Sequence, residues 1–443
     1  MLRTFLVSFT LWAVVSPVAH AQATDLDPRI QKLIAAVSEQ RLERLLTKLS
    51  SFETRNTMAT ADAPTRPLVA ARQWMFDELK NASPRLQVTF DTYQLPRQGQ
   101  RILRDVELSN VMAVLPGKSA RRIYISGHYD SLARSPRAAQ EQSFDWLNAD
   151  NRAPGANDDG SGTVLTMELA RVFAGSGIEF DATLVFIAFA GEEQGLVGAK
   201  AHAQKAAAEK AAIEAVLNND MVGNSRGGAN GAIDSESMRV FAEGPEDSPS
   251  RQIARFIQRW ATRYYPSHQV RPIARHDRFG RGGDHTAFNQ NGYAGVRLTE
   301  SNENYARQHS VDDTVDGVDF TYLARNARVN VAAAAVLALA PPAPQVNGPR
   351  GPLLGRQPSG YDARLRWDAS PGAAGYRIFW RRAWAPDWEH ELAVGNVTEH
   401  VLQDVSIDDY VFGVAAIGPG GHESLVSAYV NPPRADERVI TRE

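Results

Sequence analysis

The sequence predicts an α/β domain that is followed by a smaller all-β domain. Through the first three quarters of the chain, amphipathic helical stretches alternate with short apolar segments such as residues 182–190. This alternation is typical of a mostly parallel sheet with helices on both faces. After Pro341 the helical spacing ends, and short strands of alternating polarity follow. We therefore expect a mostly parallel sheet sandwiched by helices, together with a C-terminal all-β sandwich domain.

The first residues have the features of an export signal. Arg3 precedes an apolar run over residues 5–15, and Ala19-His20-Ala21 is a small-x-small cleavage site. A membrane anchor is the alternative, but hydroxyl residues interrupt this run and it is shorter than the ~20 residues of a span. No later segment is long and apolar enough to span a bilayer. We predict a signal peptide over residues 1–21, no membrane span in the mature chain, and a secreted or periplasmic location.

The elements of the α/β domain follow in order along residues 22–341. Asp27 and Pro28 provide the cap and the first-turn proline of an opening helix, and a leucine stripe from Leu42 to Leu49 continues the helical spacing. Later strands are assigned from runs of apolar residues, and later helices from apolar residues at helical spacing. Strands are expected at 106–115, 122–126, 182–190, 216–217 and 295–298, and helices at 161–173, 253–264 and 320–340.

Residues 345–434 form the predicted second domain, and residues 435–443 form a tail. Short strands are expected at 363–367, 376–380 and 410–416, with turn sequences rich in glycine and proline between them. Trp367, Tyr376 and Tyr410 lie on successive strands. With these aromatic residues in this order, the segment resembles a fibronectin type III domain.

Two further tryptophans of this domain lie between its strands. Trp384 and Trp388 fall in the stretch 381–390. They could pack under a long loop, or they could form an apolar platform that contacts a surface, a polymer or the α/β domain.

Composition excludes several classes of function. The 443 residues contain 48 Lys and Arg against 51 Asp and Glu, a net charge of −3, so there is no excess of positive charge to bind nucleic acid. There is no cysteine, which excludes disulfides, thiolate nucleophiles and Cys-bound zinc. Any metal must therefore be held by histidines and carboxylates.

Polar clusters follow the predicted strands at their carboxyl ends, where open α/β sheets bind their ligands. His128 and Asp130 share a face of extended backbone, so Asp130 can orient the imidazole for a metal. Glu192 and Glu193 follow a buried strand, and adjacent carboxylates in such a place usually need a cation. Taken alone, however, each cluster also fits a surface histidine or a solvated turn.

Three more candidates lie at comparable positions. Asp158 precedes a helix, where it could simply be an acidic cap. Asp220 follows the strand that ends at Leu217, and His309 lies between the last strand and the closing helix.

The order of these clusters resembles the co-catalytic di-zinc aminopeptidase family, which includes bacterial leucyl-type aminopeptidases and is related to glutamate carboxypeptidases and glutaminyl cyclases. The likeness covers about residues 42–340. The motifs that carry it are Ser126-Gly127-His128-Tyr129-Asp130-Ser131, residues 155–162, Gly191-Glu192-Glu193-Gln194-Gly195, Asn219-Asp220-Met221 and residues 309–314.

The resemblance implies two zinc ions per chain and a set of five ligands. Asp158 would bridge the two ions. Glu193 and His309 would complete the site of one ion, and His128 and Asp220 that of the other.

The resemblance also implies roles for residues that do not bind metal. Glu192 would be the general base, Asp130 would support His128, and the peptide bond after Asp158 would be cis. Relatives place a tyrosine near the final histidine to stabilise the oxyanion. Here Gln308 stands directly before His309, so Tyr305 is the nearest candidate, and packing under the loop is its alternative role. Asp284, in a Gly-Gly-Asp-His motif, would be a helix cap or a support.

These implications predict an exported zinc exopeptidase that removes N-terminal residues from peptides or proteins. In its mechanism, a metal polarises the scissile carbonyl while Glu192 takes a proton from water and passes it to the leaving amine. The alternatives are a carboxypeptidase or a glutaminyl cyclase of the same fold, and a catalytically silent binding protein. Retention of Glu192, which no structural role demands, argues against the silent protein.

Overall fold

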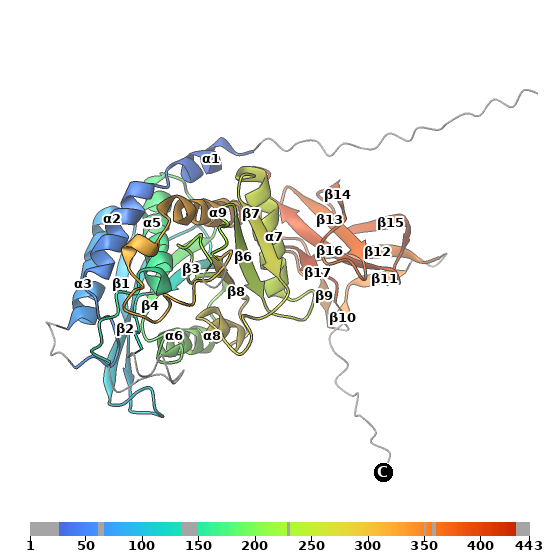
Figure 1. The fold of residues 1–443 in the computed structure, drawn as a ribbon. Coiled ribbons are helices and arrows are strands. Elements are labelled where there is room, and N and C mark those ends of the chain that lie inside the picture. The colour runs from blue at the N-terminus through green and yellow to red at the C-terminus, as the bar shows by residue number, and fades with distance from the viewer. Residues whose placement is uncertain are drawn as a thin grey trace, which may run out of the picture.

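The computed structural model describes residues 26–60, 66–134, 149–227, 231–349, 351–356 and 360–430. An α/β body carries a smaller unit of β-strands at one side (Figure 1). The predicted fold class is therefore confirmed. The predicted signal peptide and the tail at 435–443 lie outside the described residues.

The α/β body is built on one eight-stranded sheet with the strand order β1-β2-β4-β3-β5-β8-β6-β7. The strands are β1 (Gln87–Leu95), β2 (Val106–Leu115), β3 (Arg122–His128), β4 (Thr183–Phe189), β5 (Ile213–Asn219), β6 (Ser237–Ala242), β7 (Gln269–Ile273) and β8 (Gly295–Glu300).

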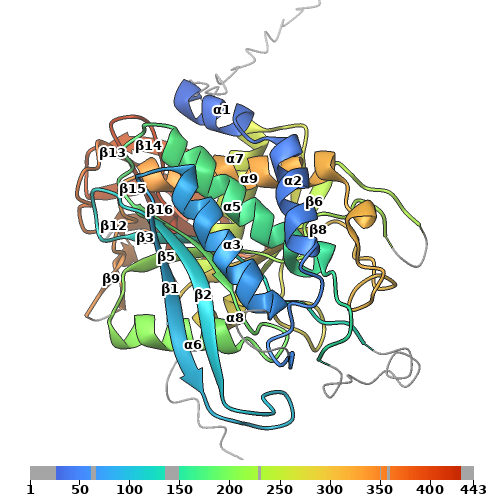
Figure 2. The ribbon, with the colours of Figure 1, turned by 90° about the vertical axis from the view of Figure 1, so that its left-hand side faces the viewer.

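The centre of this sheet is parallel and its flanks are mixed. β4, β3, β5 and β8 run in the same direction, with Ile125 of β3 opposite both Phe186 of β4 and Leu217 of β5. The long β1–β2 hairpin, which Figure 2 shows, joins antiparallel to β4, and β6 joins antiparallel to β8. Because the four central strands share one direction, their carboxyl ends meet at one edge, where the predicted site residues lie.

Helices cover both faces of the sheet. They are α1 (Pro28–Ala35), α2 (Glu39–Ser50), α3 (Pro67–Ala82), α5 (Gly162–Gly175), α6 (Val197–Ala208), α7 (Pro249–Tyr264), α8 (His285–Asn289) and α9 (Phe320–Leu339). Side chains of β3 alternate between the two faces: Ile123 and Ile125 pack into the large core with α5 and α9, whereas Tyr124 packs with α6 and α8. The site edge is therefore held between two apolar layers.

Several helices begin at side-chain caps. Asp27, Ser38, Ser248 and Asp319 each accept a backbone N–H from the first turn of α1, α2, α7 and α9 respectively. The cap at Asp27 and the first-turn proline of α1 are those expected from the sequence.

Elements of the α/β body that escaped prediction include α3, β1, β6 and β7. Most residues of β1 are exposed or half-buried, because it is the edge strand of the sheet, so it lacks the apolar run that marks a buried strand.

The C-terminal unit consists of antiparallel strands. They are β9 (Asn347–Gly348), β10 (Gly351–Pro352), β11 (Leu354–Arg356), β12 (Asp362–Arg366), β13 (Gly375–Arg382), β14 (His390–Gly395), β15 (Glu399–Ser406), β16 (Tyr410–Ile417) and β17 (Ser427–Ala428). The sheets β11-β12-β15 and β14-β13-β16-β17 share one core, in which the rings of Trp367 and Tyr376 lie 5.3 Å apart. The fibronectin type III resemblance stays a prediction.

The C-terminal unit packs on α7 through ion pairs. Arg381, which is 1% exposed, contacts Asp247 at 2.7 Å, and Arg259 contacts Glu423 at 3.2 Å. Trp388 donates from Nε1 to Oε1 of Gln252 on α7 at 3.2 Å. Of the two tryptophans considered as a platform, Trp388 therefore contacts the catalytic domain. Trp384 is 72% exposed.

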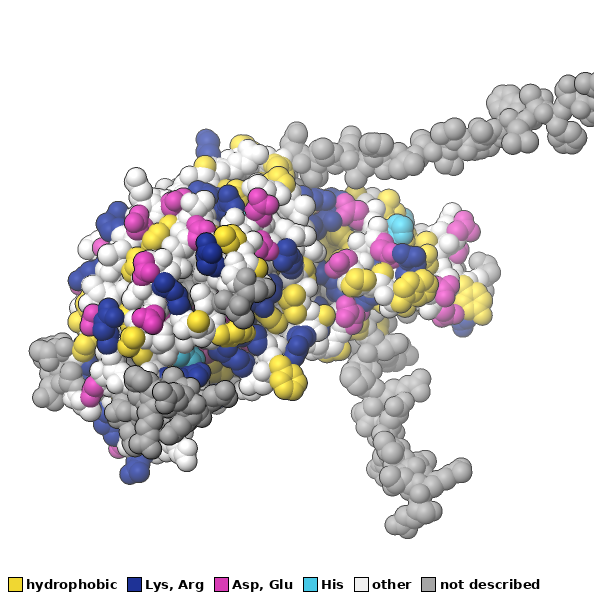
Figure 3. Space-filling model, viewed as in Figure 1, with side chains coloured by type: hydrophobic (Ala, Val, Ile, Leu, Met, Phe, Trp, Pro, Cys, Tyr) yellow, Lys and Arg dark blue, Asp and Glu magenta, His cyan; other side chains and the backbone are white. Residues whose placement is uncertain are grey.

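Both signs of charge are interspersed over the face shown in Figure 3. Among the described residues, no helix has the length and apolar character needed to cross a membrane.

Candidate metal centre

His128 is fixed at the carboxyl end of β3. It is 1% exposed, and its Nδ1 lies 3.5 Å from the Asp130 carboxylate and 3.2 Å from the Asp130 carbonyl oxygen. The carboxylate of Asp130 also accepts the backbone N–H groups of Glu192 and Glu193 at 3.1 and 3.2 Å. Asp130 therefore lies against His128, as expected, and also holds the neighbouring loop, a role that the sequence did not indicate.

The loop that carries Asp158 is held by two other carboxylates. Asp313 accepts the backbone N–H groups of Asn157 and Asp158, both at 2.9 Å. Asp159 accepts the N–H groups of His128 and Gly162 at 2.9 Å. The peptide bond between Asp158 and Asp159 is cis, as the resemblance implied. Since Asp159 caps the helix start at Gly162, the Asp158 carboxylate is left to face the histidines.

Asp158 divides its carboxylate between two histidines. Its Oδ1 lies 3.2 Å from Nε2 of His128, and its Oδ2 lies 3.1 Å from Nε2 of His309. Nε2 of His309 is also 3.1 Å from Oε1 of Glu193. One carboxylate thus faces two separate sets of ligands, as a bridge between two metal ions must.

The candidate ligand atoms form two groups. His128, Glu192 and Asp220 make up one group, and Asp158, Glu193 and His309 make up the other; within each group the ligand atoms lie within 4.8 Å of one another. The structure therefore brings together all five predicted metal ligands. It also places Glu192 beside His128, with Oε2 3.9 Å from Nε2.

The chemistry of these atoms fits a metal. Nε2 of His128 and Oε1 of Glu193 are buried, and within the described chain neither has a hydrogen-bond partner. Buried polar atoms almost always have a hydrogen-bond partner. Buried ligand atoms that lie close together without hydrogen-bond geometry therefore indicate a cation-binding site. Imidazole and carboxylate donors without cysteine suit zinc.

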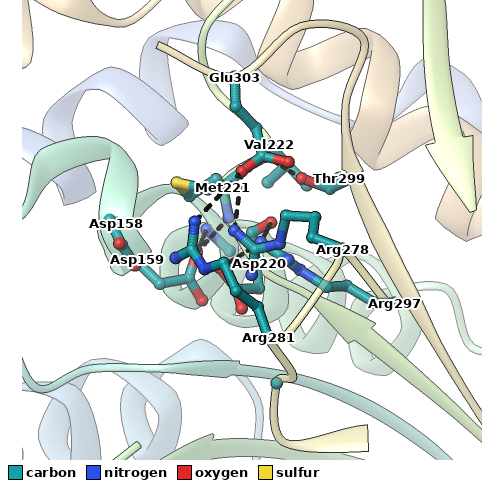
Figure 4. Close-up of polar contacts among 12 residues, drawn as sticks. Asp158, Asp159, Asp220, Met221, Val222, Arg278, Arg281, Arg297, Thr299 and Glu303 are labelled. Carbon is teal, nitrogen blue, oxygen red and sulfur yellow. Dashed lines mark hydrogen bonds and ion pairs between the residues drawn. The ribbon is translucent and has the colours of Figure 1, made fainter. Parts of the chain in front are cut away.

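The carboxylate of Asp220 is fixed by a network of arginines and acids (Figure 4). Arg297 on β8 is fully buried and donates to Oδ1 of Asp220 at 3.0 Å and to Oδ1 of Asp277 at 3.1 Å. Arg278 donates in turn to Glu303 at 2.7 Å. The sequence analysis assigned residues 295–298 only as a strand. A charged residue inside an apolar strand was the signal that could have revealed this network.

Burial perturbs the acids around the centre. It raises the pKa of Glu192 well above its usual range; Glu193 adds to this effect and His128 opposes it. Burial likewise raises the pKa of Asp284 to about 8, and neither of its carboxylate oxygens has a hydrogen-bond partner among the described residues. Such perturbed acids are typical of catalytic sites.

A cleft of about 550 Å³ opens beside the second group of ligands. Its lining residues are Arg101, Arg134, Glu192, Glu193, Gly195, Leu196, Gly280, Arg281, Gly282, Tyr305, Gln308 and His309. Tyr305 lies on this cleft but is 59% exposed, and its role in catalysis stays a prediction. Gln308, which the sequence analysis left without a role, donates from Nε2 to Oδ2 of Asp158 at 2.7 Å.

Comparisons with known proteins agree with this geometry. The profile of Peptidase family M28 matches residues 110–334. A probable zinc metalloprotease of Pyricularia oryzae is 38% identical over 93% of this chain and 86% of its own length. Another from Pyrenophora teres is 36% identical over 90% of this chain and 86% of its own.

Solved structures with the same fold include an aminopeptidase and a cyclase. The LapA aminopeptidase of Legionella pneumophila gives a TM-score of 0.55 at 21% identity, covering 71% of this chain and 76% of that one. A glutaminyl cyclase of Bacteroides thetaiotaomicron gives 0.53 at 15% identity, covering 67% and 97%. At these identities the likeness shows the fold alone.

Proposed function

Because the chain belongs to Peptidase family M28 and its relatives are probable zinc metalloproteases, we propose that it is a di-zinc exopeptidase that removes N-terminal residues from peptides. The observation that carries this proposal is the position of Asp158, whose two oxygens lie 3.2 and 3.1 Å from His128 and His309.

Five residues would hold the two zinc ions. Asp158 would bridge them, with Glu193 and His309 on one side and His128 and Asp220 on the other. When bound, zinc polarises a carbonyl group and acidifies a water molecule.

Glu192 is the proposed general base. Burial raises the pKa of Glu192, so its carboxylate is a stronger base than an exposed one. This favours accepting a proton from water, which Glu192 can then release to the leaving amine. Tyr305, the oxyanion donor expected from the sequence, lies on the same cleft and is one candidate for contact with the carbonyl oxygen.

The acidic surroundings support the aminopeptidase polarity. Glu192, Asp130 and Asp159 all lie buried or half-buried around the ligands, and carboxylates favour a protonated amine over a carboxylate.

One observation favours a carboxypeptidase as the second candidate. Arg101, Arg134 and Arg281 line the cleft, and guanidinium groups bind carboxylates well. Of the arginines just before Gly282, Arg278 is buried and paired with Glu303, whereas Arg281 reaches the cleft.

A substrate panel decides between these polarities. The zinc-loaded protein should hydrolyse leucyl-anilide and free peptides, lose activity when the peptide is N-acetylated, and keep it when the C-terminus is amidated. Efficient cleavage of an N-acetylated peptide with a free C-terminus would establish the carboxypeptidase instead. Mass spectrometry of the metal should give two zinc ions per chain.

We also propose that the protein is exported. The signal-like residues before Gln22 support this proposal. N-terminal sequencing of protein recovered outside the cytoplasm should begin at Gln22, and recovery of the uncleaved chain from membranes would favour an anchor.

A further inference from the structure

Peptide hydrolysis places negative charge on the carbonyl oxygen, and a hydrogen-bond donor must meet it there. We propose that Gln308 supplies this donor from its side-chain amide, and that Arg281 fixes the orientation of the amide. This inference rests on the proposed hydrolytic function and assigns the donor to Gln308 rather than Tyr305.

Gln308 lies at the metal centre itself. Its Nε2 is 2.7 Å from Oδ2 of Asp158, the same oxygen that lies 3.1 Å from Nε2 of His309. The side chain also lines the cleft. An amide nitrogen carries two hydrogens, so one can stay on Asp158 while the other is available to a carbonyl oxygen bound in the cleft.

Arg281 determines which end of the amide faces the metal centre. Its Nη1 lies 3.2 Å from Oε1 of Gln308. A guanidinium can only donate, so the atom that it meets must be the amide oxygen, and the NH₂ group is turned towards Asp158. Arg281 is itself kept in place by Glu303, 3.9 Å away, and by the ring of Tyr305, whose centre is 5.9 Å from the guanidinium.

Tyr305 is less suited to the role. Its side chain is 59% exposed and its ring is engaged by Arg281. Within the described chain its hydroxyl has no hydrogen-bond partner that would aim it at the ligands. A donor in contact with water stabilises an oxyanion less than one held in place beforehand.

The test compares Gln308→Met, which keeps the length of the side chain but removes the donor, with Gln40→Met as the matched control, because Gln40 is exposed on α2 and does not line the cleft. In the full-length zinc-loaded protein, Gln308→Met should lower kcat about 100-fold, the usual effect of losing one oxyanion donor, with KM nearly unchanged. Its zinc content should equal that of the wild type. Gln40→Met should keep wild-type kcat, and both Tyr305→Phe and Arg281→Met should lower kcat less than Gln308→Met does.

A binding measurement provides a readout that does not depend on turnover. By calorimetry, Gln308→Met should bind a tetrahedral aminoalkyl phosphonic acid about 100-fold more weakly, in proportion to the loss of kcat, yet bind the free amino acid product as the wild type does. Gln308→Asn, which keeps an amide on a shorter side chain, should bind the phosphonic acid with an affinity between those of the wild type and Gln308→Met.

Three results would overturn the proposal: wild-type kcat in Gln308→Met, a larger loss of kcat in Tyr305→Phe than in Gln308→Met, or recovery of Gln308→Met by excess zinc, which would make Gln308 a support for the metal only. If Gln308→Met does not fold, the Gln308→Asn and Arg281→Met variants decide by the same measurements. If the wild type hydrolyses no peptide, the proposed function fails, while phosphonic acid binding still tests Gln308.

Discussion

Arg297 lies fully buried behind Asp220 and donates to both its Oδ1 and its backbone carbonyl, at 3.0 and 3.2 Å. One carboxylate oxygen is thereby held by the protein. On the other side, a side chain at Gly283 would come within 3.2 Å of Oδ2, so the glycine leaves that oxygen room to face a metal. The orientation of a proposed metal ligand is thus set by a strand two positions away in the sheet from the strand that holds His128.

Replacement of Arg297 should destabilise the fold. Arg297→Met leaves Asp220 buried without its cation and removes one of the two arginines that pair with Asp277. Breaking such a buried pair typically costs about 3–5 kcal/mol of unfolding free energy. Urea unfolding of the metal-free protein measures this loss. Arg364→Met is the control, because Arg364 pairs with Glu399 at the surface, and it should unfold almost as the wild type does. Equal unfolding of the two variants would show that the buried pair contributes little.

Glu192→Gln should keep both zinc ions and lose turnover by about 10²- to 10⁴-fold, the usual contribution of a general base. The matched control is Glu179→Gln, since Glu179 lies at the surface with its side chain 79% exposed. Kinetics and metal analysis on the same samples provide the test. Loss of zinc from Glu192→Gln would instead make Glu192 a ligand, in keeping with its place beside His128 and Asp220.

Asp158→Ala should lose metal and activity together, because one carboxylate faces both ligand groups. Metal content after dialysis against a weak chelator, measured beside the wild type, is the appropriate assay. Two tightly bound zinc ions in this variant would show that Asp158 is not the bridge.

Acid should weaken the fold partly through His285. This residue is fully buried, and burial lowers its pKa to about 4. The unfolded chain binds the proton near pH 6.5 and the folded chain does so only near pH 4. His285 therefore leaves the free energy of unfolding unchanged above about pH 6.5 and lowers it as the pH falls from 6.5 to about 4. The loss should be about 3 kcal/mol.

Unfolding of the zinc-loaded protein between pH 7.5 and 4.5 measures this effect. The slope with pH should be shallower in His285→Gln than in the wild type. The proposed metal ligands His128 and His309 are present in both proteins, so the difference between the slopes isolates His285. Identical slopes would contradict the assignment.

Site residues could be predicted best from the sequence where they lie at the end of a predicted strand. His128, Glu193 and Asp220 follow apolar runs, so the edge at which they meet could be inferred from the order of residues alone. Arg297 and Asp313 act through partners 77 and 155 residues away in the chain, and no local pattern encodes such pairing. Gln308 escaped for another reason, because an isolated amide in a loop has no periodicity or charge to distinguish it.

The seam between α7 and the C-terminal unit contains buried ion pairs between arginines and acids. Glu423 is 2% exposed and meets both Arg259 and Arg377, and Arg381 is enclosed against Asp247. Removing the residues from 345 onwards would leave charged side chains of α7 without their ion-pair partners. The two halves should therefore melt as one cooperative unit, and calorimetry of the whole chain should record a single heat-absorption peak.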